Sequence, residues 1–169
     1  MRRPVVGVMG GGEASSEDVA VAYEVGRLIA QNGWILLNGG RNAGVMDSSA
    51  KGAHGAGGLT VGIIPDAHLG RASAYLDVAI ITGMGSARNN INVLSCNVVI
   101  ACAGGAGTLS EIALALKAER PVIVVNIELG SAFQAFIDDG RLMLAQTAEE
   151  AISLTKELLC KEKPGAPVP

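Results

Sequence analysis

Short apolar runs alternate along the chain with longer segments in which apolar residues recur at the spacing of a helix. The short runs are continuous stretches rich in Val, Ile and Leu, which is typical of strands buried on both faces of a sheet. Glycine or proline follows several of them and ends the run. The pattern predicts strands at residues 5–9, 34–37, 59–64, 78–81, 98–102, 122–125 and 142–144.

Helical segments fill the intervals between these runs. Ser15 and Asp18 are spaced as a capping box that opens a helix running to about residue 32, where Gly33 ends it. Thr147 and Glu150 have the same spacing at the start of a last helix, which we expect to end near residue 159. Further helices are expected at 45–55, at 87–94, around 132–137 and along the apolar stripe of Leu109, Ile112, Ala113 and Leu116.

Strands and helices alternate throughout, which predicts an α/β fold. We expect a single doubly wound, mostly parallel sheet, Rossmann-like, with helices on both faces. Residues 1–160 would form one Rossmann-like nucleotide-binding domain, and the proline-rich residues 161–169 a disordered tail. In such a sheet, ligands bind at the carboxyl ends of the strands.

Glycine-rich turns follow the predicted strands at 10–12, 39–44 and 104–107, and a further loop lies at 83–88. The carboxyl ends of parallel strands share one edge of the sheet, so these turns should converge there. Glycines leave backbone N–H groups bare, which favours a phosphate-bearing ligand, although glycines also serve tight turns alone. The predicted ligand-binding residues are Gly10, Gly11, Gly39, Gly40, Arg41, Gly44, Met84, Gly104, Gly105, Ala106, Gly107 and Thr108.

The stretch from Ala103 to Glu111 is the most informative of these turns, because it joins an apolar strand to a helix. This arrangement directs the positive end of the helix toward a ligand above the strand. Thr108 would cap the helix or donate its hydroxyl group. Glu111 lies one turn into the helix, where its carboxylate would repel a bound phosphate. We therefore expect Glu111 to act on the group attached to that phosphate.

Hydrophobic residues make up 49% of the chain and charged residues only 17%. This composition suits either a membrane protein or a parallel sheet covered on both faces. No apolar run approaches the roughly 18–20 residues of a membrane helix, so we favour the covered sheet and expect no membrane partner. The apolar excess also predicts helix faces that are buried in a homo-oligomer.

The net charge of −3, the lack of a Lys/Arg cluster and the 3% aromatic content argue against a nucleic-acid partner. A predicted strand follows residues 1–3 directly, without the apolar region of a signal peptide, so we expect a cytoplasmic protein. The cysteines and histidines show neither disulfide nor metal-ligand spacing, and no metal site is predicted. These residues are Cys96, Cys102, Cys160, His54 and His68.

The turns also exclude several nucleotide-binding enzymes. The first turn reads Gly10-x-Gly12-x-x-Ser15 rather than GxGxxG, and no acidic residue ends the second strand, which disfavours a dinucleotide dehydrogenase. AGGAGT lacks the lysine of a P-loop, and no GxSxG elbow of an α/β-hydrolase is present.

The GGAGTLSE motif at 104–111, an upstream arginine and the GG…GVM turn at 39–46 together resemble the LOG (Lonely Guy) family. This family was long labelled lysine decarboxylases and includes the molybdenum-cofactor carrier proteins. Its signature is PGGxGTxxE with an upstream Met-x-x-Arg-Lys, and the spacing between Arg88 and Glu111 (111 − 88 = 23) matches it. The resemblance covers about residues 4–126.

The chain departs from the LOG signature at three positions: Ala103 replaces its Pro, Asn89 replaces its Lys, and Ser110 stands where many members have Glu. The stretch 83–90 looks more like the carrier branch than the cytokinin-activating branch. The resemblance implies a dimer or tetramer and a small phosphate-bearing ligand, either a molybdopterin-type cofactor or a nucleoside monophosphate.

LOG enzymes cleave the N-glycosidic bond of a nucleoside 5′-monophosphate and release the base and ribose 5-phosphate. On this resemblance Arg88 and Glu111 are the candidate catalytic residues, and no cofactor is required for catalysis. The alternative for the pair is a structural salt bridge. Arg41 and Asp47 can reach the same rim, although a solvated loop residue and a helix cap are the simpler interpretations.

A carrier would bind the same kind of ligand without hydrolysis, and a nucleotide sensor would do so without turnover. The residues therefore leave enzyme, carrier and sensor open. A lysine decarboxylase is not expected, because the chain has no local signature of a Schiff-base lysine.

Overall fold

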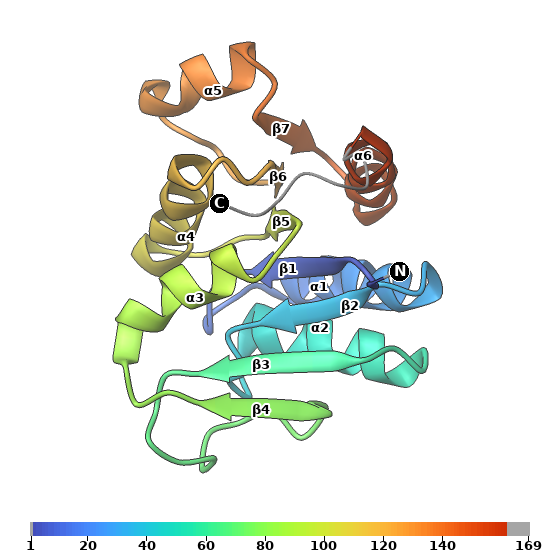
Figure 1. The fold of residues 1–169 in the computed structure, drawn as a ribbon, viewed down its shortest axis with the longest axis vertical. Helices are drawn as coiled ribbons and strands as arrows, with labels where there is room; N and C mark the ends of the chain where they lie inside the picture. Colours follow the sequence, from blue (N-terminus) through green and yellow to red (C-terminus); the bar gives the residue numbers. More distant parts are fainter. Residues whose placement is uncertain (1, 162–169) are drawn as a thin grey trace.

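Parallel strands in the order β4-β3-β2-β1-β5-β6-β7 form the sheet at the centre of the protein (Figure 1). The computed structural model describes residues 2–161. Every neighbouring pair in this sheet is parallel, which confirms the α/β prediction. The strands are β1 (Val5–Met9), β2 (Ile35–Asn38), β3 (Thr60–Ile64), β4 (Val78–Ile81), β5 (Val98–Ala101), β6 (Val122–Val125) and β7 (Leu142–Ala145).

The strand order reverses at β1, which lies between β2 and β5. The chain runs outward from β1 to the edge strand β4 and then returns to begin the other half of the sheet at β5 (Figure 1). Connections that leave two adjacent strands in opposite directions open a crevice beyond their carboxyl ends. The topology therefore places a crevice between the turns that follow β1 and β5.

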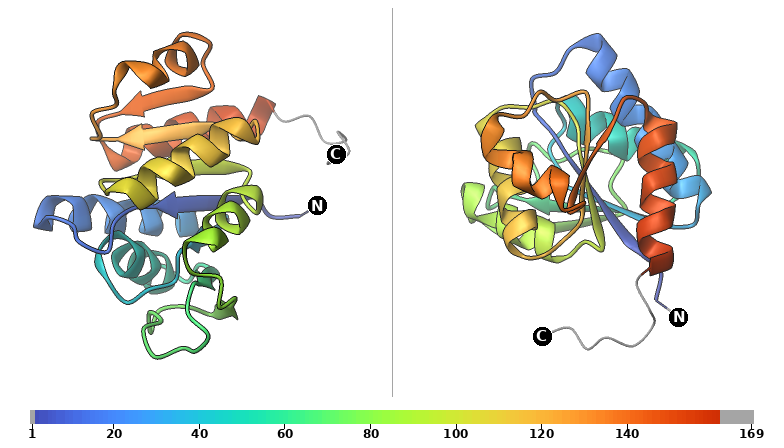
Figure 2. Two further views of the ribbon diagram at one scale, coloured as in Figure 1. Left: turned by 90° about the vertical axis from the view of Figure 1, so that its left-hand side faces the viewer. Right: turned by 90° about the horizontal axis from the view of Figure 1, so that it is seen from above.

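Helices cover both faces of the sheet, with α1, α2 and α6 on one face and α3, α4 and α5 on the other (Figure 2). No helix within residues 2–161 is long and apolar enough to cross a membrane. The helices are α1 (Ser16–Gln31), α2 (Gly44–Gly55), α3 (Asn89–Leu94), α4 (Ala106–Lys117), α5 (Gln134–Asp138) and α6 (Ala148–Lys161), with 3-10 turns η1 (Gly85–Arg88) and η2 (Ser131–Phe133).

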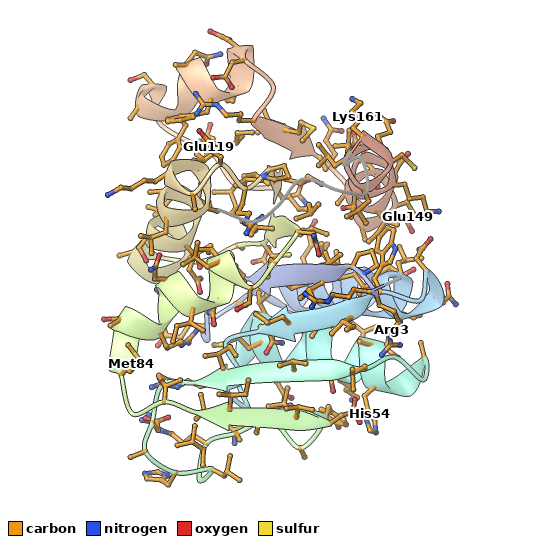
Figure 3. The ribbon with its side chains drawn as sticks, in the orientation of Figure 1. Arg3, His54, Met84, Glu119, Glu149 and Lys161 are labelled. Atoms are coloured by element: carbon orange, nitrogen blue, oxygen red, sulfur yellow. The ribbon has the colours of Figure 1, made fainter. Side chains whose placement is uncertain are left out.

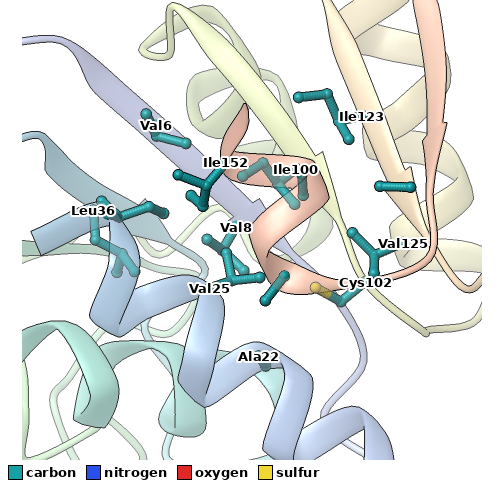
Figure 4. Packing of buried hydrophobic residues seen from close by; sticks show 14 of the residues in the cluster. Val6, Val8, Ala22, Val25, Leu36, Ile100, Cys102, Ile123, Val125 and Ile152 are labelled. Carbon is teal, nitrogen blue, oxygen red and sulfur yellow. The ribbon is translucent and has the colours of Figure 1, made fainter. Parts of the chain in front are cut away.

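Two apolar cores lie on either side of the sheet, as the continuous apolar runs predict. In one of them Val8 and Ile100 of the central strands pack with Val25 of α1 and Ile152 of α6 (Figure 4). In the other, Ile112 of α4 and its neighbours cover the opposite side of the same strands. The central strands are thus buried on both faces, which fixes the positions of the turns that follow them.

The termini of several elements differ from the prediction. The helix expected at 87–94 begins as the 3-10 turn η1, and β2 is shifted to Ile35–Asn38. The last helix continues to Lys161, the first residue of the predicted tail, and the rest of that tail lies outside the described residues. The capping box of Ser15 and Asp18 is confirmed.

The second predicted capping box, at the start of α6, forms only in part. The amide of Glu150 donates to Thr147 Oγ1 (3.2 Å), as expected. The Glu150 carboxylate, however, accepts from the amide of Gln146 (2.8 Å), one residue before the expected position. Helix α6 still begins at Ala148, directly after Thr147, as the predicted box requires.

Strand β4 departs furthest from burial on both faces, since all four of its residues are exposed. Val78, Ile80 and Ile81 are 43%, 45% and 49% exposed. The connection from β3 to β4 is a loop rather than a crossover helix, and β4 forms the edge of the sheet (Figure 1). The apolar sequence of β4 thus lies on the surface of a single copy of the chain.

Candidate functional site

A cavity of about 240 Å³ lies at the carboxyl ends of the central strands. Most of the predicted site residues line it, namely Gly10, Gly11, Gly39, Arg41, Arg88, Gly105, Gly107, Thr108 and Glu111. The cavity lining also includes residues that the sequence analysis did not single out as ligand-binding: Val8, Met9, Gly12, Met46 and Asn89. The convergence of distant turns on one rim, expected from the topology, is therefore present.

The wall formed by the start of α4 presents backbone donors. Gly105 precedes the helix, and no side chain caps it, so the expected capping role of Thr108 is wrong. The first amides of a helix, here those of Ala106, Gly107 and Thr108, have no acceptor within it. The first turn of α4 carries no acidic residue. This end of α4 therefore carries uncompensated partial positive charge, which suits an anion.

The turns after β1 and β5 are connected to each other by their backbones. The Gly11 amide donates to the Ala103 carbonyl oxygen (2.9 Å), and the Gly11 carbonyl oxygen accepts from the Val45 amide (3.0 Å). A Cβ atom on Gly104 would lie 2.1 Å from Thr108 Oγ1, and one on Gly44 would lie 2.3 Å from the Gly11 oxygen. Glycine at these positions lets the turns approach one another.

Some predicted ligand-binding residues lie outside the cavity lining: Gly40, Gly44, Met84, Gly104 and Ala106. Gly40 has a positive φ of 74°, and a Cβ atom there would meet Ile64 Cδ1 at 2.3 Å, so packing accounts for this glycine. Met84 is 49% exposed at the outer end of η1 (Figure 3). Asp47, considered as a second carboxylate, lies in the first turn of α2 and also outside the lining.

Arg88 is a buried cation with unused hydrogen-bonding capacity. It ends η1, is 8% exposed, and its Nε has no hydrogen-bond partner within residues 2–161. Its guanidinium group lies against Gly39, where a Cβ atom would be 2.6 Å from Nη1 and 2.7 Å from Nη2. Burial lowers the pKa of Arg88, with nearby Glu111 opposing and Arg41 reinforcing this shift. A bound anion would offset the burial of this charge.

Glu111 faces Arg88 across the cavity. The distance from Glu111 Oε1 to Arg88 Nη1 is 3.6 Å, which is an ion pair but not a hydrogen bond. Glu111 is 6% exposed, and burial raises its pKa, opposed by the hydrogen bond from Asn92 and by the charge of Arg88. The two side chains thus form an ion pair. Arg88 still has a hydrogen-bond donor, Nε, that a ligand could use.

Asn92 is the functional neighbour that sequence reasoning missed. Its Nδ2 donates to Glu111 Oε1 (2.8 Å), it is fully buried, and its Oδ1 has no partner among the described residues. Asn92 follows Arg88 by four residues, the spacing that places two side chains on one face of a helix. This spacing was the signal in the sequence that could have connected Asn92 with the Arg88–Glu111 pair.

A second asparagine, Asn38, shapes the turn after β2. Its Oδ1 accepts from the Gly40 amide (2.8 Å), and its Nδ2 donates to the Met46 carbonyl oxygen (2.8 Å). These bonds hold the turn that carries Gly39 and Arg41 against the start of α2.

Arg41 lies at the end of the cavity nearest β2. Its Nη2 is 3.4 Å from Asp66 Oδ1, and the same oxygen accepts from Arg71 Nη2 at 2.7 Å. The cavity lining thus holds Arg41 and Arg88 against the carboxylate of Glu111. Counting Asp66 and Arg71 beside the lining still leaves one more cation than carboxylate, which favours an anionic ligand.

The cysteines lie apart from this chemistry. Cys96 and Cys102 are buried, and burial raises the pKa of each thiol to about 12, which keeps them protonated. Within residues 2–161 no group of three or more His, Cys, Asp or Glu side chains is placed to hold a metal ion.

Comparison with known proteins identifies relatives with this fold. The model of the SLOG cluster4 family matches residues 3–152. The molybdenum cofactor binding protein of the phototrophic bacterium Rippkaea orientalis has 49% sequence identity and a TM-score of 0.89, covering 94% of this chain and 99% of that one. The molybdenum cofactor carrier protein of Chlamydomonas reinhardtii has 43% identity and a TM-score of 0.86, covering 95% and 100%.

An enzyme is also among the similar proteins. The cytokinin riboside 5′-monophosphate phosphoribohydrolase of Mycobacterium tuberculosis is 36% identical over 99 residues, which are 57% of this chain and 53% of that protein. The chain therefore matches about half the length of this enzyme. Together these similarities confirm the resemblance to LOG and carrier proteins that the motifs indicated.

Proposed function

Because the chain belongs to the SLOG cluster4 family, we propose that it binds a phosphate-bearing, nucleotide-like ligand and acts as a carrier of a molybdopterin-type cofactor. Two solved relatives that cover nearly the whole chain bear the names of molybdenum cofactor binding and carrier proteins. The observation that carries the proposal is the cavity in which the uncapped start of α4 meets the buried guanidinium group of Arg88.

The phosphate would sit at the turn formed by Gly104–Thr108. Backbone amides of Gly107 and Thr108 are available there, and the absence of side chains on Gly105 and Gly107 lets an anion reach the backbone. Arg88, with an unpartnered buried Nε, would donate charge-assisted hydrogen bonds to the same phosphate or to the adjoining sugar or side chain. This arrangement supplies both the charge and the directed donors that a phosphate needs.

The rest of the ligand would extend from the phosphate toward Gly39 and Arg41. A glycine at position 39 keeps this part of the cavity open beside Arg88. A pterin or a nucleobase is a flat heterocycle that fits between a glycine-rich turn and apolar side chains such as Met46 and Val8, which also line the cavity. A molybdenum cofactor would be cargo here: the chain's residues would hold its phosphate and heterocycle and shield them from water.

Hydrolysis of a nucleoside 5′-monophosphate is the second candidate function. The observation in its favour is a buried carboxylate, Glu111, positioned by Asn92 beside the phosphate site. Breaking the N-glycosidic bond leaves positive charge on the ribose, which an ionised Glu111 would stabilise while water adds to the sugar and the base departs. The products would be the free base and ribose 5-phosphate, as the name of the mycobacterial relative implies for that protein.

Mass spectrometry of ligand released from the purified protein tests the proposal. We expect a phosphate-bearing heterocycle to remain bound to the wild-type protein and to be lost from the R88A variant. Crystals grown with phosphate should hold an anion about 2.7–3.2 Å from the amides of the Gly104–Thr108 turn. A retained ligand without phosphate, or a phosphate bound elsewhere with this turn empty, would overturn the placement.

The two functions are separated by an assay for ribose 5-phosphate across a panel of nucleoside monophosphates. A carrier releases none, and R88A and E111Q then alter only ligand retention. An enzyme releases ribose 5-phosphate, and E111Q abolishes most of that release while the ligand still binds. The expectations of a cytoplasmic location and of a homo-oligomer remain part of the proposal.

A further inference from the structure

The turn that carries Arg41 is fixed by a long loop from elsewhere in the chain. Arg41 and Ala72 form an isolated antiparallel bridge between the turn after β2 and the loop between β3 and β4. The Asn42 amide donates to the Arg71 carbonyl oxygen, and the Ser73 amide donates to the Gly40 carbonyl oxygen, both at 2.9 Å. These bonds hold the backbone of Arg41 at the cavity although it lies in a surface turn.

The guanidinium group of Arg41 is itself oriented. Asp66 Oδ1 lies 3.4 Å from its Nη2, and Arg71 holds that same oxygen at 2.7 Å. Within residues 2–161, the Nη1 atom of Arg41 has no acceptor. Arg41 lines the cavity, and 36% of its side chain is exposed. The guanidinium group of Arg41 thus keeps donors on Nη1 and on the buried Nε that no described residue occupies.

Arg41 and the predicted phosphate site lie on turns that follow strands two positions apart in the sheet. The phosphate site follows β5, Arg41 follows β2, and β1 lies between these two strands. Neighbouring strands are about 4.8 Å apart, so the two strands that carry these turns are separated by roughly 10 Å. That length matches the distance from the phosphate of a nucleoside monophosphate, or of a pterin with a phosphorylated side chain, to its heterocycle. Arg41 is therefore placed at the heterocycle rather than at the phosphate.

We propose that Arg41 selects the heterocycle by donating two parallel hydrogen bonds to a carbonyl oxygen and an adjacent ring nitrogen. Guanine and hypoxanthine present this pair as O6 and N7, and a pterin presents the equivalent pair as O4 and N5. Arginine is the usual partner of such an edge. Adenine has an amino group in place of the carbonyl, so it would bring a donor against a donor. This inference rests on the proposed function, because it takes the phosphate to lie at α4.

Calorimetric titration of the wild-type protein with GMP, IMP, AMP, neopterin monophosphate and ribose 5-phosphate tests the inference. We expect at least one of the oxo-heterocycles, GMP with IMP or the pterin, to bind about tenfold more tightly than AMP. If a nucleotide is turned over, the same preference is measured as a ratio of kcat/KM.

Variants identify Arg41 as the source of the preference. R41M keeps the length of the side chain and should bring the oxo-heterocycles to the affinity of AMP. R41K keeps the charge without the fork and should lose most of the preference too. R141M is the control: it removes an arginine that is paired with a carboxylate, Asp139, and lies outside the cavity lining, so the preference should persist.

The outcomes separate this inference from the proposed function. If ribose 5-phosphate binds, and GMP, IMP, the pterin and AMP all bind with equal affinity, the role of Arg41 is overturned. The phosphate site is unaffected by that result. A preference that survives in R41M also overturns the role of Arg41. If no phosphate compound binds at all, the proposed function fails first. The tighter binder of the two in the wild type, GMP or the pterin, identifies whether the site prefers a purine or a pterin.

Discussion

Gly39→Ala displaces Arg88 without changing any charge in the site. The added Cβ would lie 2.6 Å from Arg88 Nη1, 2.7 Å from Nη2 and 2.7 Å from Met46 Sδ. Ordinary contacts between such atoms are about 3.5 Å or longer, so the guanidinium group must move by roughly 0.8 Å or more. Gly39 does not have a positive φ, so alanine introduces no backbone strain.

The expected effect on binding is much larger than the effect on stability. The atoms in conflict are the ends of two flexible side chains, so the fold should lose about 1 kcal/mol, which lowers Tm by roughly 2–4 °C. A charge-assisted hydrogen bond contributes about 1.5–3 kcal/mol, so losing one from Arg88 weakens phosphate binding roughly 10- to 150-fold.

Calorimetry with ribose 5-phosphate and a thermal melt measure these two effects on the same sample. Gly130→Ala serves as the control, because it also lacks a positive φ, nothing lies within 4 Å of its added Cβ, and it does not line the cavity. Wild-type affinity in G39A, combined with a crystal structure that shows Arg88 displaced, would refute the assignment of Arg88 to the ligand. Equal losses of affinity in G39A and G130A would refute the steric argument.

Further predictions concern the same cavity and the surface. If the protein hydrolyses a nucleotide, E111Q should lower turnover by about 10²–10³, a loss of roughly 3–4 kcal/mol of transition-state stabilisation. The affinity for the nucleotide should stay level or rise, and single-turnover kinetics will measure both. Burial raises the pKa of Glu111, so the stability linked to its proton is present at low pH and lost as pH rises through that pKa. Sulfate should accordingly bind the wild type more tightly as pH falls through the same pKa, because Glu111 becomes neutral. The sulfate affinity of E111Q should not change with pH, and parallel pH profiles of the two proteins would count against this. Gly107→Ala meets no atom within 4 Å and should stabilise α4 by up to about 1 kcal/mol, yet weaken phosphate binding in calorimetry. Light scattering should give a dimer or larger at micromolar concentration, and a monomer would contradict the proposed oligomer.

The strands were predictable because a strand that is buried on both faces needs a continuous run of apolar residues, and the sequence shows these runs. The central strands and the Ser15–Asp18 capping box follow from apolar runs and from short-range spacing, and they are confirmed. The convergence of the glycine-rich turns on one rim also follows, since parallel strands align their carboxyl ends. The position of Glu111 one turn into α4 singled it out, and the resemblance added Arg88, which the fold brings within 3.6 Å of it.

The sequence could not distinguish a glycine that lines the cavity from a glycine that lets a neighbouring segment pack closely. Gly40, Gly44 and Gly104 have the latter environment, which depends on contacts with residues distant in the chain. Asn92 was missed because its hydrogen bond to Glu111 joins two helices. The four-residue spacing from Arg88 was its one local signal, and that spacing does not indicate the bond to Glu111. Strand β4 is exposed although its sequence is apolar. An apolar run alone does not indicate whether other elements of the fold will cover it.

The hydrogen bond from the Gly11 amide to the Ala103 carbonyl oxygen has a consequence for the order of folding. It joins residues 103 − 11 = 92 positions apart and brings the turn after β1 against the turn that leads into α4. Contacts of such high sequence separation form late, because the intervening chain must first be ordered. A nascent chain that has emerged only through β4 has no ligand site. If the proposed ligand binds here, its loading begins only after α4 has left the ribosome, and a retained ligand would report that both halves of the sheet have joined.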